Sequence, residues 1–253
     1  MNITQSFFLG MVQGLTEFLP ISSSGHLILL QKFFNVDGNL VFFNLLLHLA
    51  TLIAVIIVFR KQVLDLIKHP FSKTAKMLYL SCVPTVLLAL VFRKVMSDVS
   101  GTFLGVCFIL TGMVLIISQV VAKQKKSIFD INYKTSFLMG VIQGIAVFPG
   151  ISRSGSTLAV GLLCGADKGD VANFSFLMSI PVIVGGFIFE LVDAVKSKTL
   201  LNINPICLCV GFTSALVFGL ISLKLMLNLV KKLKLGYFSI YLFVIAIITF
   251  IFV

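Results

Sequence analysis

GMVQGLTEFLPISSSG, residues 10–25, is repeated as GVIQGIAVFPGISRSG at residues 140–155. Eight of the sixteen positions are identical at a fixed offset of 130 residues, without a gap. Glycines and serines dominate the shared positions, while the reactive groups differ. The first copy has Glu17, Ser23 and His26 where the second has Val147, Arg153 and Ser156. The repeat therefore predicts two similar backbones, one offering a carboxylate and an imidazole and the other a guanidinium, which together suit a phosphate-bearing ligand.

Composition places the chain in a membrane. Of its 253 residues, 58% are hydrophobic and 11% are charged, and the mean hydropathy is +1.12, whereas soluble domains carry about 25% charged residues. The net charge of +11 would raise nucleic acid as a partner of a soluble protein. Here the basic residues mostly separate apolar spans, so the sequence predicts membrane lipids as the surroundings and no nucleic-acid partner.

Six apolar stretches predict full membrane crossings: residues 43–59, 75–92, 102–122, 171–192, 205–229 and 237–253. Two further apolar stretches, about 5–34 and 135–166, contain the repeats and are interrupted midway by Pro, Gly and Ser. Each arm of these stretches is too short to span a bilayer alone. We therefore expect two helix–break–helix hairpins that enter the membrane and return on the same side, and broken segments in corresponding positions of two halves point to a binding site.

The predicted fold is an all-α integral membrane protein forming one transmembrane domain over residues 1–253. Repeat one covers about 1–122 and repeat two about 135–253, and each has one re-entrant hairpin plus three transmembrane helices. Three is odd, so the second hairpin enters from the opposite face and the repeats are inverted. Loops 60–74, 123–134, 167–170 and 230–236 hold 12 Lys and Arg, against five on the other side. This bias predicts that the 12 are cytoplasmic and that both termini lie outside.

Glu17 is the first candidate for function because an ionisable residue at membrane depth is costly and needs a partner. Gln13 lies four residues earlier, on the same helix face. Mg²⁺ typically takes one or two carboxylates plus phosphate oxygens and water, so Gln13 and Glu17 are candidate cation ligands. The alternative is that Glu17 only ties the hairpin together by bonding backbone amides.

The first break carries Ser22, Ser23, Ser24 and Gly25, followed by His26. Serines and a glycine before an apolar run are typical of a helix N-terminus, where free N–H groups favour an anion. The serines can also be simple caps. His26, within the next turn, either faces the same anion or is a satisfied core residue.

The second break carries Ser152, Arg153, Ser154, Ser156 and Thr157. Arg153 presents a planar fork of donors that suits phosphate oxygens, and the hydroxyls add further donors. Alternatively, Arg153 snorkels to the interface or forms a structural ion pair with Glu17. His48, inside the first predicted crossing, is a weaker candidate for lining the cavity.

QGLTEFLPISSSGH (13–26) and FPGISRSGSTL (148–158) resemble the two signature regions of the bacterial undecaprenyl-pyrophosphate phosphatase family, the bacitracin-resistance type. HLATLIAVIIVFRK (48–61) and FSFLMSIPVIVGG (174–186) are also similar to that family, so the resemblance covers essentially the whole chain. It implies hydrolysis of the C55 isoprenoid diphosphate to the monophosphate, which recycles the lipid carrier for peptidoglycan synthesis and confers bacitracin resistance. It also implies Mg²⁺ or Ca²⁺ as cofactor, and an active site on the outer face of the bacterial cell membrane.

The resemblance places the family's acidic pair on Gln13 and Glu17, its serine and histidine on Ser23 and His26, and its phosphate-binding segment on Ser152, Arg153 and Thr157. The nucleophile stays open between Ser23, His26 and an activated water. The oligomeric state is open as well, including a homo-oligomer. The rival function is a polyprenyl-phosphate flippase or transporter, because broken helices in inverted repeats also build secondary transporters.

Overall fold

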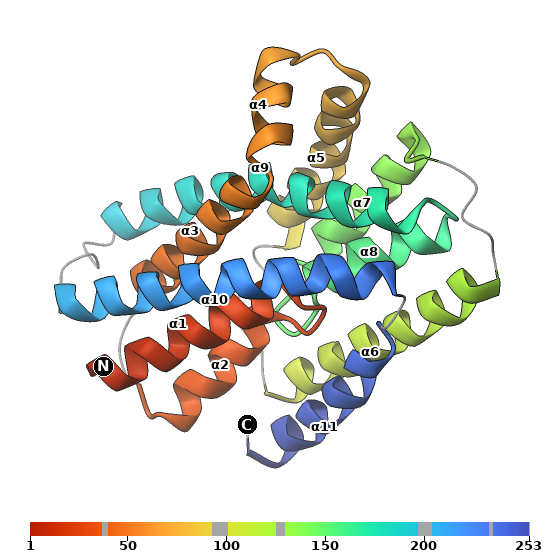
Figure 1. Ribbon diagram of the computed structural model, residues 1–253. Helices are drawn as coiled ribbons and strands as arrows, with labels where there is room; N and C mark the ends of the chain where they lie inside the picture. The colour runs from red at the N-terminus through yellow and green to blue at the C-terminus, as the bar shows by residue number, and fades with distance from the viewer. Residues whose placement is uncertain (37–39, 93–100, 125–129, 197–203, 233–234, 253) are drawn as a thin grey trace.

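The computed structural model of the chain describes residues 1–36, 40–92, 101–124, 130–196, 204–232 and 235–252. Over these residues the secondary structure is helical, and no strand is formed. Some of the loop residues used for the orientation argument lie outside the described residues, as does the end of the last predicted span: Arg93, Lys94, Lys125, Lys126, Lys198, Lys234 and Val253. In Figure 1, α4 stands at the top and both termini lie in the lower half.

Within the described part of the chain, five helices are long and apolar enough to cross a membrane, which makes the chain a multi-pass membrane protein. They are α3 (Val41–Val58), α5 (Lys73–Phe92), α6 (Gly101–Gln124), α9 (Lys168–Lys196) and α10 (Pro205–Lys231). The first five predicted crossings are thus confirmed as helices. The sixth corresponds to α11 (Tyr237–Phe252), a shorter apolar helix of 16 residues.

The two predicted hairpins are present as broken helices. α1 (Ile3–Phe18) is followed by α2 (Ser23–Phe33), and α7 (Tyr133–Ile145) by α8 (Arg153–Leu163). Asn2 and Asn132, which share the offset of 130, cap α1 and α7 with their side chains. One helix was not predicted: α4 (Arg60–Lys68) occupies part of a stretch that the sequence suggested was a loop. Its charged residues are typical of a loop, which is why the helix was missed. α4 has no buried residue and contacts mainly α3.

Each hairpin packs against a helix from the other half of the chain. α1 packs along α10, and α7 packs along α5 (Figure 1). Ser6 Oγ donates a hydrogen bond to the carbonyl of Cys207, and Ser136 Oγ donates one to the carbonyl of Met77. Ser6 corresponds to Ser136, and Met77 to Cys207, at the offset of 130 residues. Corresponding residues of the two halves therefore make corresponding contacts.

Glycines allow these helix pairs to approach closely. A Cβ on Gly10 would collide with the carbonyl of Gly211, and a Cβ on Gly140 would collide with the carbonyl of Ser81. These pairs again share the offset of 130. Without a hydrophobic driving force between helices in lipid, close backbone approach at small residues is a main source of stability.

Gly14→Ala is expected to destabilise the protein by about 1–3 kcal/mol because it overpacks this interface. The added Cβ would lie 2.5 Å from the carbonyl oxygen of Ala215 and 2.7 Å from the amide nitrogen of Gly219, and backbone cannot move aside cheaply. Gly219→Ala in the facing helix is the matched control, because its Cβ would meet Ala54 and Phe18 at 3.5 Å, an ordinary contact. Thermal unfolding in detergent measures the difference, and equal stability of the two variants would contradict it.

Candidate active site

The first break holds a strained backbone. Ser22, which precedes α2, has φ 69° and ψ 97°, a conformation that a non-glycine residue adopts only where its surroundings enforce it. Its side chain does not cap α2. The amide groups of the first turn of α2 therefore lack a side-chain acceptor, and such an end favours an anion.

The second break is built differently. Gly150 has φ 89°, which glycine adopts without a steric penalty. Ser152 caps α8, with its Oγ accepting a hydrogen bond from Gly155 N at 3.1 Å. Ser152 N in turn donates to Thr111 Oγ1 on α6 at 3.2 Å. Ser152 is thus committed to holding the break in shape, and the backbone at α8 is less open to an anion than that of α2.

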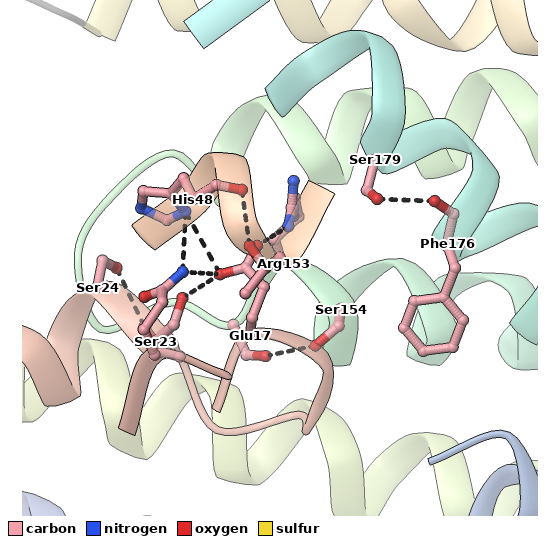
Figure 2. A network of polar contacts seen from close by, with 12 residues as sticks. Glu17, Ser23, Ser24, His48, Arg153, Ser154, Phe176 and Ser179 are labelled. Carbon is pink, nitrogen blue, oxygen red and sulfur yellow. Dashed lines mark hydrogen bonds and ion pairs between the residues drawn. The ribbon is translucent and has the colours of Figure 1, made fainter. Parts of the chain in front are cut away.

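The two breaks touch each other. Ser154 Oγ donates to the carbonyl of Leu19 at 3.0 Å, a bond that Figure 2 shows beside the loop of the first break. A Cβ on Gly25 would lie 3.2 Å from Gly150 Cα, so a glycine is needed where the backbones cross. The hairpins therefore bring two segments that are distant in the chain into one site.

Glu17 is the centre of that site (Figure 2). Its side chain is 3% exposed, and its Oε1 forms an ion pair with Arg153 Nη2. Its Oε2 accepts hydrogen bonds from Ser23 Oγ at 2.6 Å and from Gln13 Nε2 at 2.9 Å. The structure thus brings together Gln13, Glu17, Ser23 and Arg153, as the sequence predicted. The buried charge of Glu17 is balanced by a guanidinium that stays 20% exposed.

His48 joins the same cluster from α3. Its Nδ1 lies 3.0 Å from Gln13 Nε2 and 3.6 Å from Glu17 Oε2, and its side chain is 33% exposed. Since Gln13 Nε2 is a donor, the Nδ1 of a neutral His48 is the acceptor in this contact. The open question from the sequence is answered here, because His48 faces the polar site and not the core.

His26 points to a different set of partners. Its Nδ1 lies 2.8 Å from the carbonyl of Ser22, and its Nε2 lies 2.8 Å from Tyr241 Oη on α11. A carbonyl only accepts, so Nδ1 carries the proton and Nε2 accepts from the tyrosine. The Phe108 ring packs edge-on against the imidazole, with centroids 5.4 Å apart. Both nitrogens are therefore engaged outside the Glu17 cluster, which is unfavourable for His26 as the nucleophile.

Tyr241→Phe is expected to reduce stability by about 1 kcal/mol, the net value of one hydrogen bond. It is also expected to lower turnover, because the His26 ring, which donates to the carbonyl of Ser22 beside Ser23, loses the donor that orients it. Tyr237→Phe, on the same helix with a 69% exposed ring, is the control. Thermal unfolding and steady-state phosphate release measure both effects. Identical values for the two variants would show that the Tyr241 hydroxyl orients nothing.

The remaining predicted residues have mixed positions. Ser24 Oγ, 3.4 Å from Ser22 Oγ, lies at the partly exposed start of α2. Thr157 is buried, and its hydroxyl contacts Ser175 Oγ at 2.6 Å and the carbonyl of Arg153 at 2.9 Å. Thr157 thus supports the turn that carries Arg153, and its hydroxyl is already occupied.

The residues fit a divalent cation. Over the described residues, no group of three or more His, Cys, Asp or Glu side chains could hold a metal ion. Amide oxygens are also suitable ligands for hard cations, and Gln13 Oε1 is buried without a hydrogen-bond partner. The Glu17 carboxylate and the unpaired Gln13 Oε1 are both oxygen ligands, and a bound cation would give the buried amide oxygen a partner.

Sequence reasoning missed some of the groups around the site. Tyr241, Thr111 and Ser175 lie in apolar spans of α11, α6 and α9, far from either repeated motif, and nothing in the local pattern marks them. His48 did give a signal, since an ionisable residue inside a predicted span is a candidate for function by default.

Fold and site together define an integral membrane protein with a buried acid, a guanidinium and a hydroxyl gathered between two broken helices. A family model described as "Bacitracin resistance protein BacA" matches residues 6–248. The chain belongs to this family. Curated relatives extend over nearly its whole length. An "Undecaprenyl-diphosphatase" of Carboxydothermus hydrogenoformans is 39% identical over 250 residues, covering 98% of this chain and 96% of the relative.

Two further relatives carry the same name. "Undecaprenyl-diphosphatase 4" of Bacillus cereus is 40% identical over 243 residues, covering 95% of this chain and 93% of the relative. An "Undecaprenyl-diphosphatase" of Methanobrevibacter smithii is 35% identical over 276 residues, with 99% and 97% covered. The similarity thus includes both broken helices and the helices that pack on them.

Proposed function

We propose that this chain is an undecaprenyl-diphosphate phosphatase, which hydrolyses the C55 isoprenoid diphosphate to the monophosphate and phosphate. Family membership and the shared name of the relatives support the substrate and the reaction. The observation that carries the chemistry is the contact of Ser23 Oγ and the Arg153 guanidinium with the two oxygens of one buried carboxylate, Glu17. Recycling of the lipid carrier for peptidoglycan synthesis and bacitracin resistance follow from this reaction.

Ser23 is the nucleophile in this proposal. Its hydroxyl is 2.6 Å from Glu17 Oε2, so the carboxylate can accept the proton as Oγ attacks the terminal phosphorus. The bond from that phosphorus to the bridging oxygen breaks, and the lipid monophosphate leaves. When the diphosphate binds, before this attack, Arg153 turns its fork from Glu17 to the phosphate oxygens, and the uncapped first turn of α2 adds amide donors. Ser22, Ser24, Gly25 and Ser154 line this phosphate site.

The second step hydrolyses the phosphoserine. Water attacks the phosphorus, the bond to Ser23 Oγ breaks, and Oγ regains the proton that Glu17 took up in the first step. Both hydrogens of the water leave with the phosphate, which is released as dihydrogen phosphate. A divalent cation, Mg²⁺ or Ca²⁺, held by Gln13 and Glu17, would neutralise charge on the diphosphate. Trapping with labelled substrate tests the nucleophile. Label on Ser23 is expected, whereas label on His26 or no label at all would favour the other two routes.

The orientation remains part of the proposal. We place the chain in the bacterial cell membrane with both termini outside, the active site opening to the outer face, and the two halves as inverted repeats. Two observations support the inverted repeat. Each hairpin packs on a helix of the other half, and corresponding residues make the same contacts at an offset of 130. Accessibility of tags at the two termini tests the orientation. A homo-oligomer stays a prediction.

The alternative, a flippase or transporter for the same class of lipid, is less well supported. The relatives share the name of a hydrolase. The contact of Ser23 Oγ with Glu17 Oε2 at 2.6 Å supports covalent chemistry, which lipid translocation does not need. Purified protein in liposomes separates the functions. Phosphate release from the lipid diphosphate marks the enzyme, and translocation of the lipid without release marks a flippase.

Removal of divalent cations is expected to abolish phosphate release. Addition of EDTA to the purified protein should reduce turnover by at least about 100-fold, the scale of losing a major charge-stabilising contact in the transition state. Excess Mg²⁺ or Ca²⁺ should restore it. Undiminished turnover in EDTA would mean that Arg153 and the α2 amides alone stabilise the charge.

A further inference from the structure

The mechanism above gives no role to His48, although its imidazole is part of the Glu17 cluster (Figure 2). Three polar atoms meet there: Gln13 Nε2, Glu17 Oε2 and His48 Nδ1. The sides of the triangle that they form are 2.9, 3.0 and 3.6 Å. They come from two different helices, α1 and α3, so the arrangement is a product of the fold and not of one helical turn.

The amide of Gln13 is the member of this triangle that can change its character. Its Nε2 faces the carboxylate and the imidazole, while its Oε1 is buried without a partner. A half-turn about the last side-chain bond exchanges the oxygen and the nitrogen of an amide at little cost in shape. The triangle then presents three lone-pair donors: an amide oxygen, a carboxylate oxygen and an imidazole nitrogen.

Two sides of this triangle match the edges of an octahedral coordination sphere, and the third, between Glu17 Oε2 and His48 Nδ1, is longer at 3.6 Å and would shorten when an ion binds. Ligands about 2.0–2.2 Å from a cation are about 3 Å from their neighbours. We propose that His48 Nδ1 is a third protein ligand of the cation, beside Gln13 Oε1 and Glu17 Oε2. This rests on the proposed function, in which Gln13 and Glu17 hold the cation. Imidazole suits transition ions such as Fe²⁺ and Zn²⁺, whereas Ca²⁺ prefers oxygen ligands, so an imidazole ligand favours a transition ion over Ca²⁺. Mn²⁺ shares the oxygen preference of Mg²⁺ but is paramagnetic, and it therefore serves as the probe of this site.

The other charges in the site leave room for this ion. Arg153 is paired with Glu17 Oε1, so it does not occupy Oε2. A carboxylate oxygen offers two lone-pair directions. Ser23 Oγ takes one of them, and the other, which Gln13 Nε2 occupies in this structure, is freed when the amide turns. The ion would therefore be adjacent to the nucleophilic hydroxyl.

The second repeat provides an internal comparison. Gln143 is equivalent to Gln13, and its Oε1 is also buried without a partner, while its Nε2 donates to Thr85 Oγ1 at 3.3 Å. At the offset of 130, Glu17 is replaced by Val147 and His48 by Met178. An unpaired amide oxygen is thus common to both halves. The carboxylate and the imidazole that would complete a metal site are present only in the first.

The test detects the nitrogen ligand directly. Full-length protein in nanodiscs of zwitterionic lipid is loaded with Mn²⁺ alone, and electron spin-echo envelope modulation is recorded on the bound ion. The wild type is expected to show the ¹⁴N modulation of a coordinated imidazole, and His48→Gln is expected to lose it. His48→Gln keeps a hydrogen-bonding side chain at a partly exposed position, and thermal unfolding checks its fold. Loss of Mn²⁺ binding by a folded His48→Gln would also support the proposal.

Selectivity is read from competition. In His48→Gln, displacement of bound Mn²⁺ should need at least about tenfold less Ca²⁺ than in the wild type. His69→Gln is the control, because His69 is 66% exposed and belongs to no site described above; it should keep the wild-type signal. Unchanged modulation in His48→Gln, a wild type without bound Mn²⁺ or without ¹⁴N modulation, or unchanged Ca²⁺ competition would overturn the proposal.

Phosphate release by the same preparations keeps the two proposals apart. A wild type that releases no phosphate counts against the phosphatase. An active wild type whose metal signal does not depend on His48 counts only against the third ligand.

Discussion

Glu17→Gln is expected to lower kcat by at least about 100-fold, which is the scale of removing a key transition-state contact. The amide has the shape of the carboxylate, so it can still accept the hydrogen bond from Ser23, but it is not a base and has no charge for Arg153 or for a cation. The first step of the proposed reaction needs that base, and the second needs the proton that it has taken up. Steady-state phosphate release in detergent micelles measures kcat, with the lipid diphosphate as substrate.

Asp65→Asn is the matched control for this change. It also neutralises a carboxylate, but Asp65 lies on α4 with its side chain 69% exposed, away from the site. Its turnover should equal that of the wild type. Near-normal hydrolysis by folded Glu17→Gln would remove the carboxylate from the mechanism and reduce it to a structural partner of Arg153.

Arg153→Ala should cost at least as much turnover, because the guanidinium is the permanently charged group that can grip the diphosphate. The change also leaves the Glu17 carboxylate buried without its ion-pair partner, which destabilises proteins by about 3–5 kcal/mol. Arg153→Lys separates the two effects, since it keeps a charge near Glu17 but lacks the planar fork. We expect it to fold, with kcat at least about tenfold below wild type and a raised KM.

The double variant Glu17→Gln with Arg153→Ala completes the cycle. Removing both partners removes the uncompensated charge, so its loss of stability should be smaller than the sum of the two single losses, and the coupling energy isolates the pair. Arg60→Ala, an exposed arginine at the start of α4, controls for loss of basic charge. If Arg153→Ala folds and turns over normally, the phosphate must be bound by other groups.

Much of this site could be predicted because the repeat marks it. An offset without gaps predicted two broken helices, and their opposite reactive groups predicted that Glu17 and Arg153 would meet. What could not be predicted is the direction in which a side chain points after the backbone turns. His26 is one turn into α2, and only the strained conformation of Ser22 and the position of α11 determine that its ring contacts Tyr241.

The limits of prediction elsewhere have a similar cause. The charged residues of α4 predicted a loop. A helix with no buried residue need not carry the long apolar run by which the other helices were recognised. The contribution of His48 depends on how α3 packs beside α1, a contact between segments that no local pattern connects.

The packing of α1 on α10 has a consequence for how the chain is made. The ribosome completes α1 almost two hundred residues before it reaches α10, so the glycine face of α1 and the hydroxyl of Ser6 have no lasting neighbour during most of synthesis. Contacts so distant along the chain form late and slowly. A nascent polypeptide halted before residue 205 would hold Glu17 in the membrane but lack α10, the helix against which α1 packs.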